Sequence, residues 1–175
     1  MANRKTEIEI PKIYVACLAA YNSGHPHGAW IDADQGAWEI YDEIKAILKA
    51  SPIAGAEEFA IHDYEGFEGV RIAESQGLGS VVEIAAFIIE HGALGGALIE
   101  YFGDIAEAKT AIEDHYAGEY SSLADFAQEL TEEGTAIPEN LRFYIDYERM
   151  ARDLAINDVL TIETAGDQVH VFWSR

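Results

Sequence analysis

The segment VVEIAAFIIEHGALGGALIEYF, residues 81–102, contains the longest apolar run of the chain that fits a helix, and it decides how the rest is organised. Its apolar residues extend almost around a helix: Val81, Val82, Ile84, Ala85, Ala86, Ile88 and Ile89. The run 81–89 is shorter than the roughly 18 residues of a membrane span. Gly92 separates it from a second helical segment at 94–102. We therefore predict packed helices in the middle of the chain and no membrane segment.

The residues before this segment alternate between strand and helix patterns. An apolar run at 13–18, a turn at 22–24 and a short run at 29–32 are typical of paired strands. Apolar residues at three- and four-residue spacing predict a helix over 36–51, and the run 58–64 predicts a third strand. Together they form a small α/β unit.

The residues after the segment indicate further helices and a hairpin. A helix is predicted over 104–116, and another opens at Ser122, where a hydroxyl is followed three residues later by an acid. A third helix runs over 138–156, with proline in its first turn. Two strand-like runs, 159–164 and 168–173, are joined by a short turn and predict a β-hairpin.

These elements predict an α+β fold arranged as an elongated chain of small domains. The first domain, residues 1–74, combines a small sheet with a helix. The second, residues 75–115, is a helical bundle. The third, residues 116–175, combines helices with the β-hairpin.

The charge of the chain is strongly negative and unevenly distributed. It has 32 acidic and 11 basic side chains, a net charge of -21, and residues 50–141 hold 19 of the acids but only 2 of the bases. From Thr110 to Leu141 there is no Lys or Arg. Such a surface repels nucleic acid and anionic membranes and attracts basic partners.

The acids form stripes opposite the apolar faces of the predicted helices. Neighbouring like charges on a helix cost roughly 0.2 to 0.5 kcal/mol per pair, so stability does not explain the stripes. Duplex DNA carries one negative charge per roughly 1.7 Å of axis, which makes 21 charges equivalent to about 10 base pairs. Ordinary solvated faces and adaptation to high salt remain alternatives. The candidate phosphate-mimicking carboxylates are Asp104, Glu107, Glu113, Asp114, Glu119, Asp125, Glu129, Glu132, Glu133 and Glu139.

Motifs for catalysis are weak. The cluster of His25, His27, Asp32 and Asp34 has ligand types that suit zinc and offers an alternative function, a small metal-dependent hydrolase, although its spacing matches no established metal motif. We expect no cofactor and no resident metal. The first residues lack a signal-peptide pattern, which predicts a cytoplasmic protein.

Four stretches are spread in order over nearly the whole chain: YVACLAAYNSG (14–24), GAWID (28–32), EEFAIHDY (57–64) and NLRFYIDY (140–147), the last followed by RDL (152–154). Together they resemble the ArdA antirestriction proteins of plasmids, conjugative transposons and phages.

The resemblance implies a rod-like protomer of three domains that imitates bent duplex DNA without catalysis. Its partners would be the specificity and methyltransferase subunits of a type I restriction-modification enzyme, bound in the DNA groove, with no direct binding of nucleic acid. It also implies a homodimer formed through the C-terminal domain, which would place Phe143, Tyr144 and Tyr147 near the dimer contact.

Overall fold

The computed structural model of the chain describes residues 9–174. The chain divides into two compact units, one ending at Gly96 and one beginning at Ala97, and each is described by itself. Each unit contains a three-stranded antiparallel sheet together with helices, so the predicted mixture of α and β structure is confirmed. The division into three domains stays a prediction.

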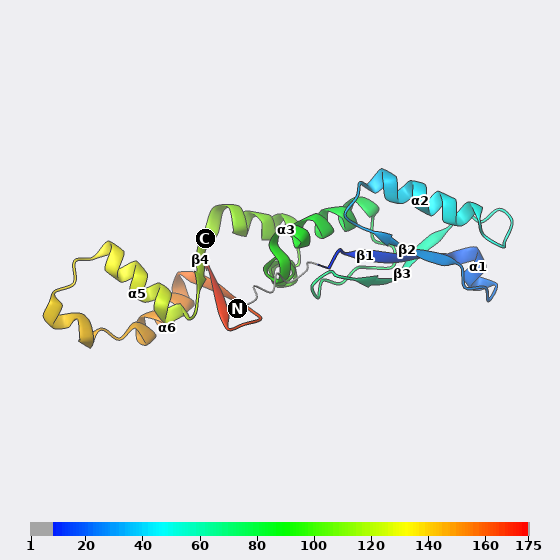
Figure 1. Cartoon of the computed structure of the whole chain (residues 1–175). Helices are drawn as coiled ribbons and strands as arrows, with labels where there is room; N and C mark the ends of the chain where they lie inside the picture. Colours follow the sequence, from blue (N-terminus) through cyan, green and yellow to red (C-terminus); the bar gives the residue numbers. More distant parts are fainter. Residues whose placement is uncertain (1–8, 175) are drawn as a thin grey trace, which may run out of the picture. The chain divides into compact units, whose positions relative to one another are not determined.

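The first unit is built on the sheet β2-β1-β3. The central strand β1 (Lys12–Cys17) pairs antiparallel with β2 (Gly28–Asp32) and β3 (Phe59–Glu65). Helix α2 (Ala37–Lys49) covers one face of this sheet (Figure 1). The three predicted strands and the helix are confirmed, and a short helix α1 (Leu18–Asn22) follows β1 directly.

The core of this unit follows from alternation along the strands. Ile13 and Val15 of β1 and Ile40 and Ile44 of α2 have no exposed surface, and Ile31 of β2 is 1% exposed. Alternate residues of a strand point to the same face of the sheet, so the apolar half of β1 and β2 meets the apolar stripe of α2. The burial of Cys17 agrees with the packed thiol that its apolar surroundings indicate.

Helix α3 (Leu78–Phe102) is two helical segments joined at Gly92, which has φ 57° and ψ -139°. The break predicted at this glycine is confirmed. By length and composition α3 is apolar enough to cross a membrane. Its two segments are each shorter than the roughly 20 residues that a span needs, and Val81 and Leu98 are fully buried. A core helix explains these features.

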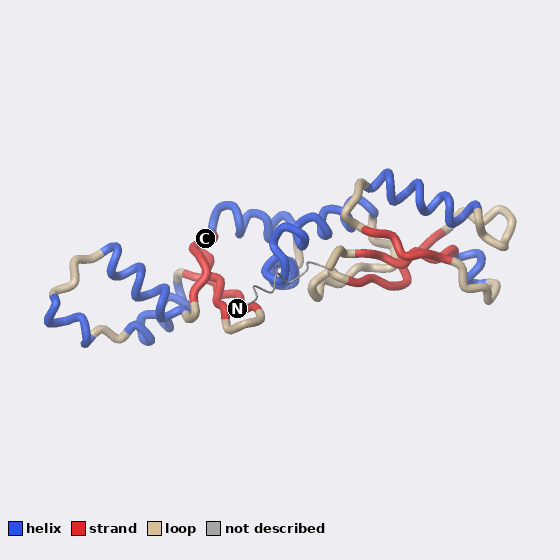
Figure 2. Tube along the Cα trace, in the orientation of Figure 1, coloured by secondary structure: helices blue, strands red, loops and turns tan. Residues whose placement is uncertain are grey.

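The second unit continues from the end of α3 and contains the three-stranded sheet β4-β6-β5, whose strands are red in Figure 2. Its further elements are α4 (Ile105–Thr110), a π-helical turn η1 (Ala111–His115), β4 (Tyr116–Tyr120), α5 (Leu123–Gly134), a 3-10 helix η2 (Glu139–Tyr144), α6 (Tyr147–Asn157), β5 (Val159–Thr164) and β6 (Gln168–Trp173). Phe126 of α5 forms a core cluster with Val159 and Val171.

Two helices predicted in this unit differ from the structure. The helix expected over 104–116 is found over 105–115, as α4 followed directly by the π-helical turn η1, and only Tyr116 lies outside it, in a strand that pairs with β6. The helix expected over 138–156 is interrupted because Ile145 is extended and Asp146 caps a new helix, accepting a hydrogen bond from the backbone N–H of Arg149 at 2.9 Å. An aspartate that binds the backbone in this way favours a helix start over a helix interior.

Candidate functional site

The ten carboxylates proposed from the sequence all lie in the second unit, and all ten residues are exposed. They are contributed by consecutive elements. Asp104 and Glu107 belong to the start of α4, Glu113 and Asp114 to η1, and Glu119 to β4. Helix α5 supplies Asp125, Glu129, Glu132 and Glu133, and η2 begins with Glu139.

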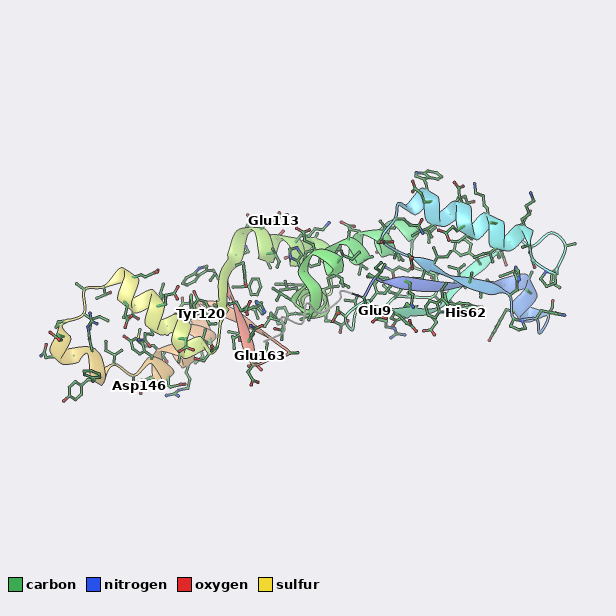
Figure 3. All side chains as sticks on the ribbon, viewed as in Figure 1. Glu9, His62, Glu113, Tyr120, Asp146 and Glu163 are labelled. Atoms are coloured by element: carbon green, nitrogen blue, oxygen red, sulfur yellow. The ribbon has the colours of Figure 1, made fainter. Side chains whose placement is uncertain are left out.

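The start of α4 is set by one of these acids. Asp104 has extended backbone angles, and its Oδ1 accepts a hydrogen bond from the N–H of Glu107 at 3.0 Å. This cap satisfies a backbone donor that the first helical turn would leave unpaired. The following π-helical turn carries Glu113, labelled in Figure 3, and Asp114 on exposed positions. The local fold therefore presents charge along the segment that leads into the sheet.

Helix α5 separates an apolar face from an acidic one. Its cap is Ser122, whose Oγ accepts a hydrogen bond from the N–H of Asp125 at 3.1 Å, as the sequence predicts. Phe126 and Ala127 are 4% and 0% exposed, whereas Leu130 is 38% exposed. The buried stripe is thus narrow, and Asp125, Glu129, Glu132 and Glu133 all lie on the exposed surface of the helix.

The hydrogen-bond partners of the α5 carboxylates are neutral. Tyr120, labelled in Figure 3, donates its hydroxyl to Oε1 of Glu129 at 3.2 Å, and Gln128 donates its amide to Oε1 of Glu132 at 3.0 Å. Neutral donors orient a carboxylate without cancelling its charge. These side chains remain available for cations that come from a partner.

Ion pairing differs between the two units. In the first, Lys12 Nζ lies 3.0 Å from Glu65 Oε2 and Lys45 Nζ 2.6 Å from Asp42 Oδ1, and these hydrogen bonds raise the pKa of both lysines. Among residues 97–174, with Glu107 left aside, none of the ten candidate carboxylates forms an ion pair with Lys, Arg or His. The second unit thus presents a largely uncompensated anionic surface.

A buried histidine, not anticipated from the sequence, anchors β4 to the sheet. His170 is 7% exposed, with Nδ1 2.9 Å from the hydroxyl of Tyr116 and Nε2 3.2 Å from Oγ1 of Thr164. Burial lowers the pKa of His170, while the nearby charge of Glu119 acts in the opposite direction. One feature of the sequence could have predicted the burial of His170: it is the single polar residue inside the apolar run VHVFW (169–173).

The metal-site alternative has no geometric support. His27 Nε2 lies 2.7 Å from the backbone carbonyl oxygen of Ile47, so this nitrogen carries a proton and donates it there. Across residues 9–174 no three His, Cys, Asp or Glu side chains lie close enough together to hold a metal ion. The structure therefore does not gather His25, His27, Asp32 and Asp34 into a site.

The residues expected near a dimer contact differ in exposure. Phe143 and Tyr144 of η2 are 94% and 84% exposed, and Leu141 beside them is 48% exposed. Tyr147, in the first turn of α6, is partly buried. Two adjacent aromatic side chains that are almost fully exposed form an apolar patch, and such patches often mark a contact with a partner. The dimer contact itself stays a prediction.

Comparison with known proteins agrees with the resemblance seen in the sequence. Comparison with curated proteins gives no match. A family model described as antirestriction protein (ArdA) matches residues 13–167, which is most of the chain and extends over parts of both units. The chain therefore belongs to the ArdA family of antirestriction proteins.

Proposed function

We propose that the protein inhibits type I restriction-modification enzymes by occupying their DNA-binding groove as a mimic of duplex DNA. Family membership supports an antirestriction role. The observation that carries the finer proposal is the set of ten exposed carboxylates in the second unit, together with the absence of Lys and Arg from Thr110 to Leu141. No catalytic step is part of this function.

The carboxylates take the place of phosphates. Residues three or four positions apart on a helix have Cβ atoms about 5 to 6 Å apart, and α5 carries Asp125, Glu129, Glu132 and Glu133 at such steps. Lys and Arg side chains that normally hold phosphate oxygens accept carboxylate oxygens with similar geometry. Binding releases counterions from the acidic surface, so the affinity falls as salt rises.

A second copy of the chain extends the charged surface in this proposal. The exposed aromatic side chains of Phe143 and Tyr144 are the candidate contact, and a pair of chains would carry charge equivalent to about 20 base pairs. Sedimentation of a Phe143→Ser, Tyr144→Ser double variant tests this. We expect a dimer for the wild type and a monomer for the variant.

We also propose that the protein acts in the cytoplasm, where restriction enzymes meet incoming DNA.

The proposal is tested by neutralising α5 and comparing the result with an equal change elsewhere. The test variant is Asp125→Asn, Glu129→Gln, Glu132→Gln, Glu133→Gln. The matched control changes four exposed acids of the first unit, Asp34→Asn, Glu39→Gln, Glu57→Gln and Glu58→Gln, which removes the same number of negative charges. Inhibition of DNA cleavage by a type I enzyme is then measured for both.

We expect the α5 variant to inhibit about thirtyfold more weakly, because four exposed charge contacts at roughly 0.5 kcal/mol each add about 2 kcal/mol. The control should change inhibition by less than about threefold. Equal losses in both variants would contradict the assignment to α5 and favour a general effect of acidity. Loss caused by any one of the four substitutions alone would indicate a local site instead of a mimic.

A further inference from the structure

An open polar pocket of about 520 Å³ lies in the first unit. It is formed by the end of α1, by β3 and by the segment that follows β3. Its lining includes Tyr21, Ile61, His62, Arg71, Ile72 and Glu74. None of the ten candidate mimic carboxylates contributes to it, because all ten belong to the second unit. The proposed function therefore gives this pocket no role.

A β-bulge in β3 places His62, labelled in Figure 3, at the pocket. Two consecutive residues of β1 pair with Asp63 and with Ile61, so His62 is an extra residue without a partner in β1. The backbone N–H of Ile61 donates to the carbonyl oxygen of Glu74 at 2.9 Å, which holds the segment 71–74 beside β3. Bulges redirect side chains and are common next to functional sites. The backbone thus brings the walls of the pocket together.

The ring of His62 is oriented by two neighbours. Tyr21 packs edge-on against it, with ring centroids 4.7 Å apart and an interplanar angle of 80°. Nε2 of His62 lies 3.6 Å from Oε1 of Glu74. The other ring nitrogen, Nδ1, forms no hydrogen bond with any residue in the range 9–174. When the imidazole carries two protons, both nitrogens are donors, and Nδ1 is the one without a partner.

Arg71 is the second group of the pocket that lacks a partner. It is the only Lys or Arg between Lys49 and Lys109. It is exposed, and within the described part of the chain its side chain forms no hydrogen bond or ion pair. An arginine without an acidic partner is unexpected in a chain with 32 acids. Its planar guanidinium offers five N–H donors in a fork that matches phosphate and carboxylate oxygens.

We propose that this pocket binds the phosphoryl group of a small phosphorylated molecule. Such a group carries about -1.5 to -2 charges at pH 7 and three strong acceptor oxygens. The fork of Arg71 matches two of these oxygens, and protonated His62 supplies a further donor at Nδ1. A carboxylate, with one charge and two oxygens, uses fewer of these donors. The pocket is larger than one phosphate ion, and Tyr21, 59% exposed, offers a ring to the organic part of an ester.

The net charge of the chain determines the conditions under which this anion binds. Exposed acids of the same unit, such as Asp63 on β3, repel it at low salt. At about 0.15 M salt the screening length is about 8 Å, so distant acids act less strongly than Arg71 in direct contact. We expect a dissociation constant on the order of 1 mM under these conditions. The inference does not depend on DNA mimicry, because it concerns other residues and a ligand of opposite charge.

The direct test is an NMR titration of the full chain in about 0.15 M NaCl at pH 6.5. The Hε1 resonance of His62, assigned from a His62→Gln variant, is followed as inorganic phosphate, phenyl phosphate or acetate is added. We expect saturable shifts with the two phosphate compounds and at least fivefold weaker binding of acetate. Tighter binding of phenyl phosphate identifies an ester as the ligand, and equal binding identifies free phosphate. Acetate binding as tight as phosphate binding, or no saturable shift with either phosphate compound, would overturn the inference.

Two variants separate the pocket from the general charge of the unit. Arg71→Gln removes the guanidinium and should weaken phosphate binding about tenfold, the ratio that corresponds to about 1.4 kcal/mol. Lys49→Gln removes one positive charge from an exposed residue outside the pocket and should change binding by less than about twofold. Thermal unfolding of both variants verifies that each is folded. Equal weakening in both would show that net charge alone attracts the anion, which would contradict a defined site.

Discussion

The hydroxyl of Tyr120 lies 3.2 Å from Oε1 of Glu129 and joins the end of β4 to the acidic face of α5. The ring of the same tyrosine packs edge-on against Phe126 at 5.2 Å. Burial raises the pKa of Tyr120, and the hydrogen bond and charge of Glu129 add to that effect. One side chain therefore connects the core of the second unit with a carboxylate of the proposed mimic surface.

Replacing Tyr120 by Phe should cost little stability and leave inhibition nearly intact. The ring packing is kept, and a partly exposed hydrogen bond contributes about 0.5 to 1 kcal/mol. Urea unfolding measures the change. Tyr120→Ala removes the packing as well and should cost about 2 kcal/mol or more. Equal destabilisation by Phe and Ala would show that the hydroxyl, not the ring, holds β4 against α5.

Removing the cap of α5 should destabilise the second unit by about 1 kcal/mol. The variant is Ser122→Ala, which removes the oxygen that accepts from the N–H of Asp125. Ser121→Ala, at the exposed preceding residue, is the control and should change the free energy of unfolding by less than about 0.5 kcal/mol. The midpoint of urea unfolding distinguishes the two. A similar loss in both would contradict the assignment of the cap to Ser122.

The buried histidine predicts a pH dependence of stability. Because burial lowers the pKa of His170 below its ordinary value of 6.5, the unfolded chain takes up a proton at mildly acidic pH that the folded chain does not. The contribution of His170 to stability is therefore present at pH 7.5 and decreases as the pH falls below 6.5.

Unfolding of wild type and His170→Gln at pH 7.5 and 5.5 measures this contribution, since the carboxylates common to both chains cancel in the difference. The stability advantage of the wild type should shrink at the lower pH. An advantage that grows on acidification would contradict the sign, and would mean that Glu119 dominates over burial at this position.

Adding a side chain at Gly92 should lower the stability of the protein. Its φ of 57° with ψ of -139° lies in a region that only glycine adopts readily, so Gly92→Ala should cost about 1 to 3 kcal/mol. Gly79 lies in the same helix without a positive φ, and a Cβ added there meets no atom within 4 Å. Gly79→Ala should therefore be neutral or stabilise by up to about 1 kcal/mol. Thermal unfolding of both variants checks the contrast.

The sequence predicted those parts of the fold that depend on local pattern. The stripe of α2, the cap at Ser122 and the break at Gly92 are all visible within a few residues of chain. The strand β4 was missed because its partner in the sheet is far away in the sequence. Glu119 pairs with His170, and no pattern in the neighbouring residues predicts that pairing. The helix break before Tyr147 was missed because Asp146 resembles any solvated helix residue until its capping bond is seen.

Part of the candidate site could likewise be predicted from local sequence patterns, and part could not. Exposure of Asp125 and Glu132 followed from the apolar face of α5, since both lie on the side of the helix opposite the buried stripe of Phe126 and Ala127. The hydrogen bond between Tyr116 and His170 could not be foreseen, because the two residues meet only when the last strand of the chain pairs with β4.

The measurement that tests the central claim most directly is competition between this protein and duplex DNA for the methyltransferase core of a type I enzyme. Fluorescently labelled DNA carrying the recognition site is bound to the core, and the protein is added at several salt concentrations. We predict that it displaces the DNA at low salt and that its own affinity for the core falls steadily as salt rises. Failure to displace DNA at low salt, or displacement that does not depend on salt, would contradict the account.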